Sequence, residues 1–270
     1  MAKVKNIGVL VKKENPKAVS FFEKLLLWLK KEGVKVQTSE SSFASCELLM
    51  TLGGDGTFIK GVRFLNGACV PVVGVRLGEY GFLTEISPDH FEKELKPYIE
   101  GDFKIEERLK VRASVIRRRK SAAFFHGLND AVLHTTGLSR ISNYKVSIDG
   151  HLLTTLKADG IVISTPTGST AYSLAAGGPL IDPKNSVMVV TPICPQNTAH
   201  KPMVISQNSS ISIEIICMNC EVLLTIDGQE QLKLEEGDKI EVQKSDQKAY
   251  FAKHNPNNYF ELLRNKVFLS

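Results

Sequence analysis

The 270-residue chain lacks the signature motifs of several large enzyme classes. It contains no Gly-x-x-x-x-Gly-Lys-Ser/Thr, which excludes a P-loop kinase. No Gly-x-Gly-x-x-Gly follows its first strand-like run, which argues against a standard dinucleotide dehydrogenase. The motifs His-Glu-x-x-His and Gly-x-Ser-x-Gly are also absent, and the six histidines show no metal-ligand spacing. The function must therefore be sought in other motifs.

Long apolar runs and paired cysteines are missing as well. No stretch approaches the ~20 apolar residues of a membrane-spanning helix, and Met1–Lys5 leads into a short strand-like run, Ile7–Val11, rather than a signal sequence. The five cysteines are odd in number and scattered. Cys217 and Cys220 form a lone Cys-x-x-Cys in a β-rich run, which favours two strand cysteines over a zinc or redox site. We therefore expect a cytoplasmic protein.

The charge balance favours an enzyme with anionic substrates. A net charge of +5 is too small for a nucleic-acid-binding surface, which requires a concentrated basic patch. The densest basic run, Arg117–Lys120, follows the alternating segment Val111–Val115 and is interpreted as a solvated hairpin tip. We expect neither nucleic acid nor a membrane as a partner.

Residues 1–101 alternate strand-like and helix-like patterns, which predicts an α/β domain with a Rossmann-like parallel sheet. The expected strands are Asn6–Val11, Val34–Gln37, Glu47–Leu52 and Val70–Val75, and the expected helices are Lys17–Lys31, Thr57–Leu65 and one beginning near Phe91. Pro97 should limit or kink the third helix.

Residues 102–250 change to short alternating segments between turns, which predicts an all-β sandwich. The expected strands are Lys110–Arg117, Ala122–His134, Tyr144–Ile148, Gly160–Ser164, Ser186–Val190, Ser210–Cys217, Glu221–Ile226 and Lys239–Gln243. Asp149-Gly150 and Asp227-Gly228 are among the turn signals. The tail, residues 251–270, looks helical from Asn258 to Leu269 and is expected to pack back onto the first domain.

A glycine-rich turn, Thr51–Thr57, is the first candidate site. It lies between a buried strand and a helix, where backbone N–H groups attract an anion. Gly53, Gly54 and Gly56 would allow positive φ and a close approach to a ligand. Asp55 would repel phosphate, so it suits metal organisation or a base aimed at a hydroxyl that attacks phosphorus. An ordinary surface turn is the alternative.

The segment Asp159–Ser173 is the second candidate. A buried strand runs into a Pro-Thr-Gly-Ser-Thr turn and then into a small-residue helix, Ala171–Ala176. Hydroxyls, N–H groups and the ring of Tyr172 are what a nucleotide's ribose, phosphate and base require. An N-capped helix without a ligand is the alternative.

Asn129 and Asp130 interrupt an otherwise strand-like run. Because adjacent strand side chains face opposite ways, at least one of the two should meet a loop or a polar group. An Asn-Asp turn is the other interpretation, and the residues alone leave the choice open.

Together these motifs resemble the NAD kinase family. The similarity rests on Gly53–Thr57, Leu77–Thr84, Asn129-Asp130 and Asp159–Tyr172, in matching order and spacing from Val9 to the tail. Diacylglycerol, sphingosine and phosphofructo-kinases share the Gly-Gly-Asp-Gly element, whereas Thr165–Tyr172 is specific to NAD kinases. The resemblance implies transfer of phosphate from ATP or polyphosphate, with a divalent metal such as Mg²⁺, to the adenosine ribose 2′-hydroxyl of NAD. It also implies an α/β domain, a β-sandwich and a returning C-terminal helix.

The resemblance assigns roles to individual residues. Asp55 becomes the catalytic base or orienter of the hydroxyl, and the donor phosphates are assigned to Gly53, Gly54, Gly56 and Thr57. The implied NAD-binding residues are Gly56, Phe82, Asn129, Asp130, Lys157, Asp159, Thr167, Thr170, Ala171 and Tyr172. Lys157 and Asp159 match positions at the nicotinamide end, often across a subunit interface, so a homodimer or homotetramer is implied.

Several positions depart from the family pattern. Position 130 is Asp where Glu is frequent, and Arg76 and Tyr80 stand where Asn and Leu are common. Gln196 and Lys201 replace a His and an Arg in a family loop, and Lys does not substitute for Arg at a bidentate site.

Two other functions are alternatives to the NAD kinase. A kinase of a lipid or sugar phosphate could share the glycine turn, but a lipid kinase would need a membrane-docking surface that the chain does not display. A regulator that binds nucleotide without catalysis gains nothing from an acid beside phosphates, and Asp55 is intact.

Overall fold

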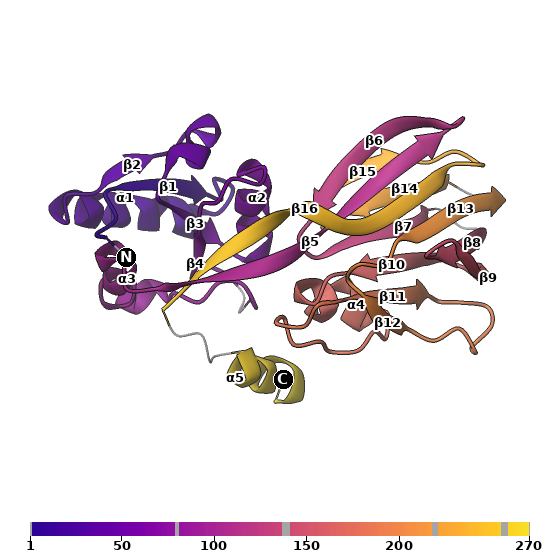
Figure 1. Cartoon of the computed structure of the whole chain (residues 1–270). Coiled ribbons are helices and arrows are strands. Elements are labelled where there is room, and N and C mark those ends of the chain that lie inside the picture. The colour runs from indigo at the N-terminus through magenta and orange to yellow at the C-terminus, as the bar shows by residue number, and fades with distance from the viewer. Residues whose placement is uncertain (1, 79–80, 137–140, 218–220, 255–258, 270) are drawn as a thin grey trace. The chain divides into compact units, whose positions relative to one another are not determined.

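The computed structural model describes residues 2–78, 81–136, 141–217, 221–254 and 259–269 (Figure 1). The chain divides into two compact units: unit 1 comprises Met1–Glu107 and Ala249–Ser270, and unit 2 comprises Arg108–Lys248. Cys220 and Tyr80 lie outside the described residues.

Unit 1 is a parallel sheet flanked by helices. Its strands are β1 (Asn6–Val11), β2 (Lys35–Gln37), β3 (Leu48–Gly53), β4 (Val72–Arg76) and the end of β16 (Lys239–Lys253). Its helices are α1 (Pro16–Lys31), α2 (Asp55–Phe64), α3 (Phe91–Glu100) and α5 (Tyr259–Leu263), with short turns of helix at Glu40–Ser45, Pro88–His90 and Arg264–Phe268. The strand order is β2-β1-β3-β4-β16, and all of these pairs are parallel. The predicted parallel sheet is confirmed.

The helices of unit 1 cover both faces of this sheet. On one face, α1 and α3 pack onto alternate residues of β3, including Leu48 and Met50. On the other face, α2 approaches so closely that a Cβ on Gly61 would lie 2.8 Å from Thr51 Cγ2. Because adjacent strand residues point to opposite faces, the continuous apolar run of β3 serves both layers.

The ends of the helices follow from local sequence. Asn15 caps α1 by accepting the Lys17 N–H at 3.0 Å, and Pro16 occupies the first turn, where its missing N–H costs nothing. α3 continues past Pro97 and ends at Glu100, where Gly101 adopts φ 77°. Leu262 of α5 is buried, so the tail packs onto unit 1 as expected.

Unit 2 is a β-sandwich. Its strands are the rest of β5 (Lys104–Arg117) and of β16, with β6 (Lys120–Gly127), β7 (Asp130–Thr136), β8 (Ser142–Ile148), β9 (His151–Ala158), β10 (Gly160–Ser164), β11 (Val187–Ile193), β12 (Met203–Ser206), β13 (Ile211–Cys217), β14 (Glu221–Ile226) and β15 (Glu230–Lys233). One antiparallel sheet has the order β12-β11-β10-β7-β14-β15, and the facing sheet contains β16-β13-β8-β9 with β5 and β6. Inward residues of both sheets, such as Leu133 and Val146, share one core.

Unit 2 departs from one expected strand and contains the expected hairpin tip. The expected strand Ala122–His134 is wrong in extent, because the chain turns at Leu128-Asn129 and forms β6 and β7 on either side. The hairpin tip at Arg117–Lys120 is confirmed, since Arg117 pairs with Lys120 across the β5–β6 turn. Arg117 also forms an ion pair with the buried Asp238 at 2.7 Å, so this basic run is partly neutralised.

Candidate active site

The first candidate site lies at the carboxyl ends of β1 and β3. In the order β2-β1-β3-β4, the chain leaves β1 toward β2 on one side while β3 lies on the other, and this switch opens a crevice beyond the two strand ends. Lys12 follows β1, and Gly54 and Asp55 follow β3. The Lys12 N–H donates to the Leu52 carbonyl at 3.0 Å, which holds the two strand ends together.

The glycine turn is the N-terminus of α2, as expected, but its glycines serve a different purpose. Gly54 is the N-cap with φ −105°, and Gly56 lies in the first turn of the helix. The expectation of positive φ is wrong at Gly53, Gly54 and Gly56 alike. Gly53 is needed for space, because a Cβ there would clash with the Thr57 side chain. Thr57 and Phe58 donate their N–H groups to the Gly54 carbonyl at 3.0 and 3.2 Å.

The carboxylate of Asp55 binds the backbone of the next loop. Its Oδ2 accepts the Phe82 N–H at 2.6 Å, and its Oδ1 accepts the Leu83 N–H at 3.1 Å. Gly81 lies directly against it, and a Cβ at that position would overlap the carboxylate. The side chain is half-buried. Two oxygens offer about four lone-pair directions, so the carboxylate can still accept a hydrogen bond from a ligand.

Two cavities of unit 1 meet at this turn, each of about 430 Å³. The first is lined by Lys12, Asn15, Gly54, Asp55, Leu77, Gly78, Gly81 and Lys266. The second is lined by Leu10, Val11, Lys12, Lys13, Glu14, Thr38, Glu40, Gly54, Gly56, Thr57 and Lys60. Lys12 and Gly54 line both. A helix N-terminus with lysines on either side favours an anion, and the carboxylate of Asp55 adjoins only the first cavity.

The C-terminal segment contributes to the first cavity. The Lys266 ammonium lies 4.7 Å from the centroid of the Phe82 ring, within the range of a cation–π contact. Phe82 therefore touches the site twice, through its N–H on Asp55 and through its ring under Lys266. The sequence pattern identified Phe82 and missed Lys266.

Asn129 and Asp130 form a further candidate site, in unit 2. They sit at the turn where β6 passes into β7, which favours the turn interpretation of these residues. The Asn129 Oδ1 is buried and has no hydrogen-bond partner in the described part of the chain. Asp130 is buried, and this burial, reinforced by the nearby charge of Asp227, raises the pKa of its carboxyl to about 7. A buried amide oxygen without a partner is suited to a ligand donor.

Asp227 lies behind this turn and was expected only as a turn residue. Its carboxylate accepts the backbone N–H groups of Leu128, Asn129 and Asp130 at 2.8, 2.7 and 3.1 Å. Burial raises the pKa of Asp227, and the three N–H groups and then Lys110 oppose that rise. An Asp-Gly hairpin turn was visible in the sequence, but the contact across nearly a hundred residues was not.

The segment after β10 approaches the same turn from the opposite side. The Thr165 N–H donates to the Asn129 carbonyl at 2.8 Å, and a Cβ on Gly168 would clash with that carbonyl. The expected helix Ala171–Ala176 is present as the short α4 (Tyr172–Ala175), with Ala171 and Ala176 as its caps, and a 3₁₀ turn at Thr167–Thr170 precedes it.

Individual side chains of this segment occupy different environments. Thr167 is buried, and its Oγ1 accepts a hydrogen bond from Arg108 at 3.3 Å. The Thr170 hydroxyl donates to the Thr167 carbonyl, and the ring of Tyr172 is 46% exposed. The structure thus brings Asn129 and Asp130 beside the start of the Thr165–Thr170 segment.

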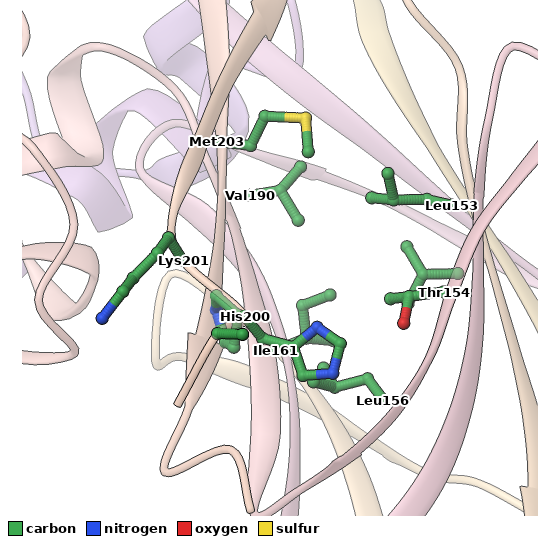
Figure 2. A pocket seen from close by; sticks show the side chains of 11 residues that line it. Leu153, Thr154, Leu156, Ile161, Val190, His200, Lys201 and Met203 are labelled. Carbon is green, nitrogen blue, oxygen red and sulfur yellow. The ribbon is translucent and has the colours of Figure 1, made fainter. Parts of the chain in front are cut away.

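Lys157 and Asp159 lie at the end of β9 and before β10. Lys157 is exposed, and its carbonyl accepts the Gln196 N–H at 2.9 Å, so the altered loop begins beside it. Farther along this loop, His200 and Lys201 help to line an apolar cavity of about 280 Å³. Figure 2 shows the Lys201 side chain directed away from the apolar side chains of Leu153, Val190 and Met203.

The described residues contain neither a cluster of metal-ligating side chains nor a helix able to cross a membrane. No three side chains of His, Cys, Asp or Glu gather there in an arrangement that could hold a metal ion. No described helix has both the length and the apolar composition needed to span a membrane.

The chain matches the models of two protein-family domains. The ATP-NAD kinase N-terminal domain matches residues 36–103, and the ATP-NAD kinase C-terminal domain matches residues 128–254. The first range contains the Asp55 turn, and the second contains the Asn129-Asp130 turn and the segment after β10.

Curated proteins and solved structures agree with these domains. The chain is 37% identical to an NAD kinase from Geotalea daltonii and 39% identical to one from Syntrophotalea carbinolica, each over 98% of both proteins. Its fold is similar to yeast NADH kinase solved with NADH, with a TM-score of 0.91, 27% identity and coverage of 99% of this chain and 88% of the other. An NAD kinase from Archaeoglobus fulgidus, solved with ATP, gives a TM-score of 0.80, 26% identity and coverage of 96% and 98%.

Proposed function

The chain belongs to the NAD kinase family and phosphorylates NAD to NADP, and we propose that Asp55 orients the 2′-hydroxyl of NAD and accepts its proton. The observation that carries this proposal is the half-buried Asp55 carboxylate beside a lysine-lined cavity at the N-terminus of α2. Among the described residues that line that cavity, Asp55 is the one with a carboxylate.

The proposed reaction is an in-line phosphoryl transfer. The ribose 2′-oxygen forms a bond to the terminal phosphorus of the donor while the bond from that phosphorus to its bridging oxygen breaks. The hydroxyl proton passes to Asp55, and the negative charge stays on the departing donor. Because a carboxylate is a weak base, Asp55 takes the proton late, and most of the acceleration comes from positioning. The hydrogen bonds from Phe82 and Leu83 keep the carboxylate in place before the hydroxyl arrives.

We assign the donor phosphates to the glycine turn of Gly53, Gly54, Gly56 and Thr57 and to the lysines around it. Lys12, Lys13 and Lys60 line the second cavity, where their charges would offset those of a triphosphate or a polyphosphate. ATP is the proposed donor, since the matching family models are named ATP-NAD kinase and the Archaeoglobus fulgidus relative was solved with ATP. Mg²⁺ would enter with these phosphates, whose hard oxygens suit it, and would withdraw charge from the transferred group.

We assign NAD itself to Gly56, Phe82, Asn129, Asp130, Lys157, Asp159, Thr167, Thr170, Ala171 and Tyr172. The strongest support comes from Asn129, whose buried Oδ1 lacks a partner among the described residues and can accept a ribose hydroxyl. The exposed ring of Tyr172 offers a face for stacking. Buried Thr167 already receives a hydrogen bond from Arg108, so its own hydroxyl proton is left to donate.

We further propose a cytoplasmic homodimer or homotetramer. The family resemblance carries this assignment, and β9, the strand that contains Lys157, supports it, because its Leu152 and Leu153 are 61% and 45% exposed. Large exposed apolar side chains at one place are typical of a surface that a partner covers. Cys46, Cys69 and Cys194 are free thiols, in keeping with a reducing compartment.

The experiment is an end-point assay of NADP formation by the purified protein with Mg²⁺, NAD and either ATP or polyphosphate. Losing a base typically costs roughly 10²–10⁴-fold in rate. We expect Asp55→Asn to lose at least about a hundredfold in kcat, with circular dichroism unchanged. Asp89→Asn, a surface acid of the same unit, is the control and should keep full activity. An Asp55→Asn enzyme with more than about a tenth of the activity would refute the assignment.

A further inference from the structure

We propose that Asp227 is a positioning residue for NAD: its carboxylate fixes the backbone of Leu128, Asn129 and Asp130 and thereby aims the side chains of Asn129 and Asp130. The proposal rests on the assignment of these two side chains as NAD contacts. Asp227 does not need to touch the dinucleotide itself.

The geometry is that of one carboxylate gathering three successive amides. Oδ2 of Asp227 accepts the Leu128 N–H at 2.8 Å, and Oδ1 accepts those of Asn129 and Asp130 at 2.7 and 3.1 Å. The Asp227 N–H in turn donates to the Asp130 carbonyl at 3.1 Å. Three consecutive N–H groups can converge on one group only in a narrow set of backbone conformations, so these bonds fix the turn.

The opposite side of the turn is held equally closely. Thr165 donates its N–H to the Asn129 carbonyl at 2.8 Å and its hydroxyl to the Leu128 carbonyl at 2.6 Å. With these bonds, the amides and carbonyls of Leu128, Asn129 and Asp130 are all satisfied. The Asn129 Oδ1, by contrast, is buried without a partner in the described ranges. The backbone of the site is therefore fixed while one side-chain acceptor is left unsatisfied, which is the arrangement of a preorganised binding group.

The negative charge of Asp227 helps to hold the turn at Leu128, Asn129 and Asp130. Lys110, also buried, is the cation whose charge favours the ionised carboxylate, and its ammonium donates to Gln247 at 3.0 Å. An asparagine has the same shape but only one acceptor oxygen. Its NH₂ group would face either the Leu128 N–H or the two N–H groups on the other side, so at least one bond would be lost.

A second Asp-Gly turn, at Asp149-Gly150, allows the positioning role of Asp227 to be distinguished from turn formation alone. Asp149 precedes Gly150 in the β8–β9 hairpin, adopts φ 50°, and accepts the Ser210 N–H at 2.8 Å and the Ser209 hydroxyl at 2.9 Å. Asp227 precedes Gly228 with φ 53°. Both residues therefore suit the turn and bind neighbouring groups, but only Asp227 binds the Asn129-Asp130 backbone. Asp149 is the matched control.

The test measures steady-state kinetics of Asp227→Asn and Asp227→Glu beside Asp149→Asn, with melting temperatures for all three. We expect both Asp227 variants to raise the KM for NAD, by about tenfold for asparagine, with the KM for ATP within twofold of wild type. Glutamate keeps the charge, but its extra methylene displaces the oxygens, so it should raise the KM for NAD about threefold. Asp149→Asn should change neither KM.

The outcomes separate a positioning role from a purely structural one. A folded Asp227→Asn enzyme with an unchanged KM for NAD would overturn the proposal, and so would equal losses for NAD and ATP. If asparagine prevents folding, the glutamate variant decides by the same criteria. Asn129→Ala, measured in parallel, tests the underlying assignment. If it leaves the KM for NAD unchanged, the NAD contacts are wrong. If it raises that KM while the Asp227 variants do not, only the positioning role fails.

Discussion

Above neutral pH the buried carboxyl of Asp130 should destabilise unit 2, and Asp130→Asn should remove this penalty. Burial first, and the charge of Asp227 second, raise the pKa of Asp130 from 3.8 to about 7. In the unfolded chain the same carboxyl ionises near its ordinary value. The folded state therefore holds an extra proton between the two values, and its stability decreases as the pH rises through that interval.

The size of the effect follows from the two pKa values. A tenfold difference in proton affinity is worth about 1.4 kcal/mol. Between pH 5 and pH 8 the unfolded carboxyl is ionised throughout, while the folded one releases its proton only near pH 7. The wild-type protein should therefore lose about 2.5 kcal/mol more than Asp130→Asn across this range, on the order of a quarter of a typical folding free energy. The contribution of the Asp130 carboxyl to the free energy of unfolding is fully present below pH 3.8 and is lost as the pH rises through about 7.

The measurement is urea unfolding without NAD at pH 5, 6, 7 and 8, followed by circular dichroism in the β-sheet region. Fluorescence of Trp28, the chain's one tryptophan, reports unit 1 in the same samples. Hydrogen bonds from Ser210 and Ser209 lower the pKa of Asp149, so its exposed carboxyl stays ionised in this pH range. Asp149→Asn should therefore retain the wild-type pH dependence. Parallel pH curves for wild type and Asp130→Asn would show that Asp130 does not titrate near pH 7, and would refute the reasoning.

Two further substitutions test the geometry around Asp55. Gly81→Ala places a Cβ against the Asp55 carboxylate and should lower kcat at least about tenfold by displacing it. Gly61→Ala, the control, crowds the contact of α2 with Thr51 and should lower the melting temperature while keeping kcat. Equal losses of kcat in the two variants would contradict the explanation that Gly81→Ala acts by displacing Asp55. Lys12→Met should raise the KM for ATP about tenfold and leave that for NAD within threefold, because losing a charged hydrogen bond costs about 1.5–3 kcal/mol. The exposed Lys24→Met is its control, and an unchanged KM for ATP in Lys12→Met would remove that lysine from the donor site.

The architecture of unit 1 could be predicted because its sequence signals are local. Helical spacing in α1 and the capping by Asn15 and Pro16 set that helix within one residue of the expected start. In unit 2 the sequence predicted a sandwich but missed β9, β12 and β15. In β9 the adjacent Leu152 and Leu153 are both exposed, so the alternation that marks a half-buried strand is broken.

The candidate site was predictable only where its functional residues are consecutive in the sequence. The glycine turn and Thr165–Tyr172 stand out because each combines unusual residues in a short span. Lys266 does not, because a lysine near the end of a chain has no local signal, and only the packing of the tail brings it to the Phe82 ring. Long-range contacts of this kind depend on the fold and cannot be derived from spacing.

The two Asp-Gly turns show why even a correct local prediction leaves function open. Both were identified as turns, and both adopt the same positive φ at the aspartate. Asp149 lies at the surface, where its carboxylate can be replaced at little cost. Burial raises the pKa of Asp227, whereas three N–H groups and the charge of Lys110 favour its ionised carboxylate. The charge of Asp227 contributes to the raised pKa of Asp130. Asp130, a second buried acid beside Asp227, lowers the stability of the unliganded protein, so its presence requires a compensating benefit. We propose that this benefit is a fixed pair of side chains for the dinucleotide, and the pH dependence of Asp130 would then measure its cost.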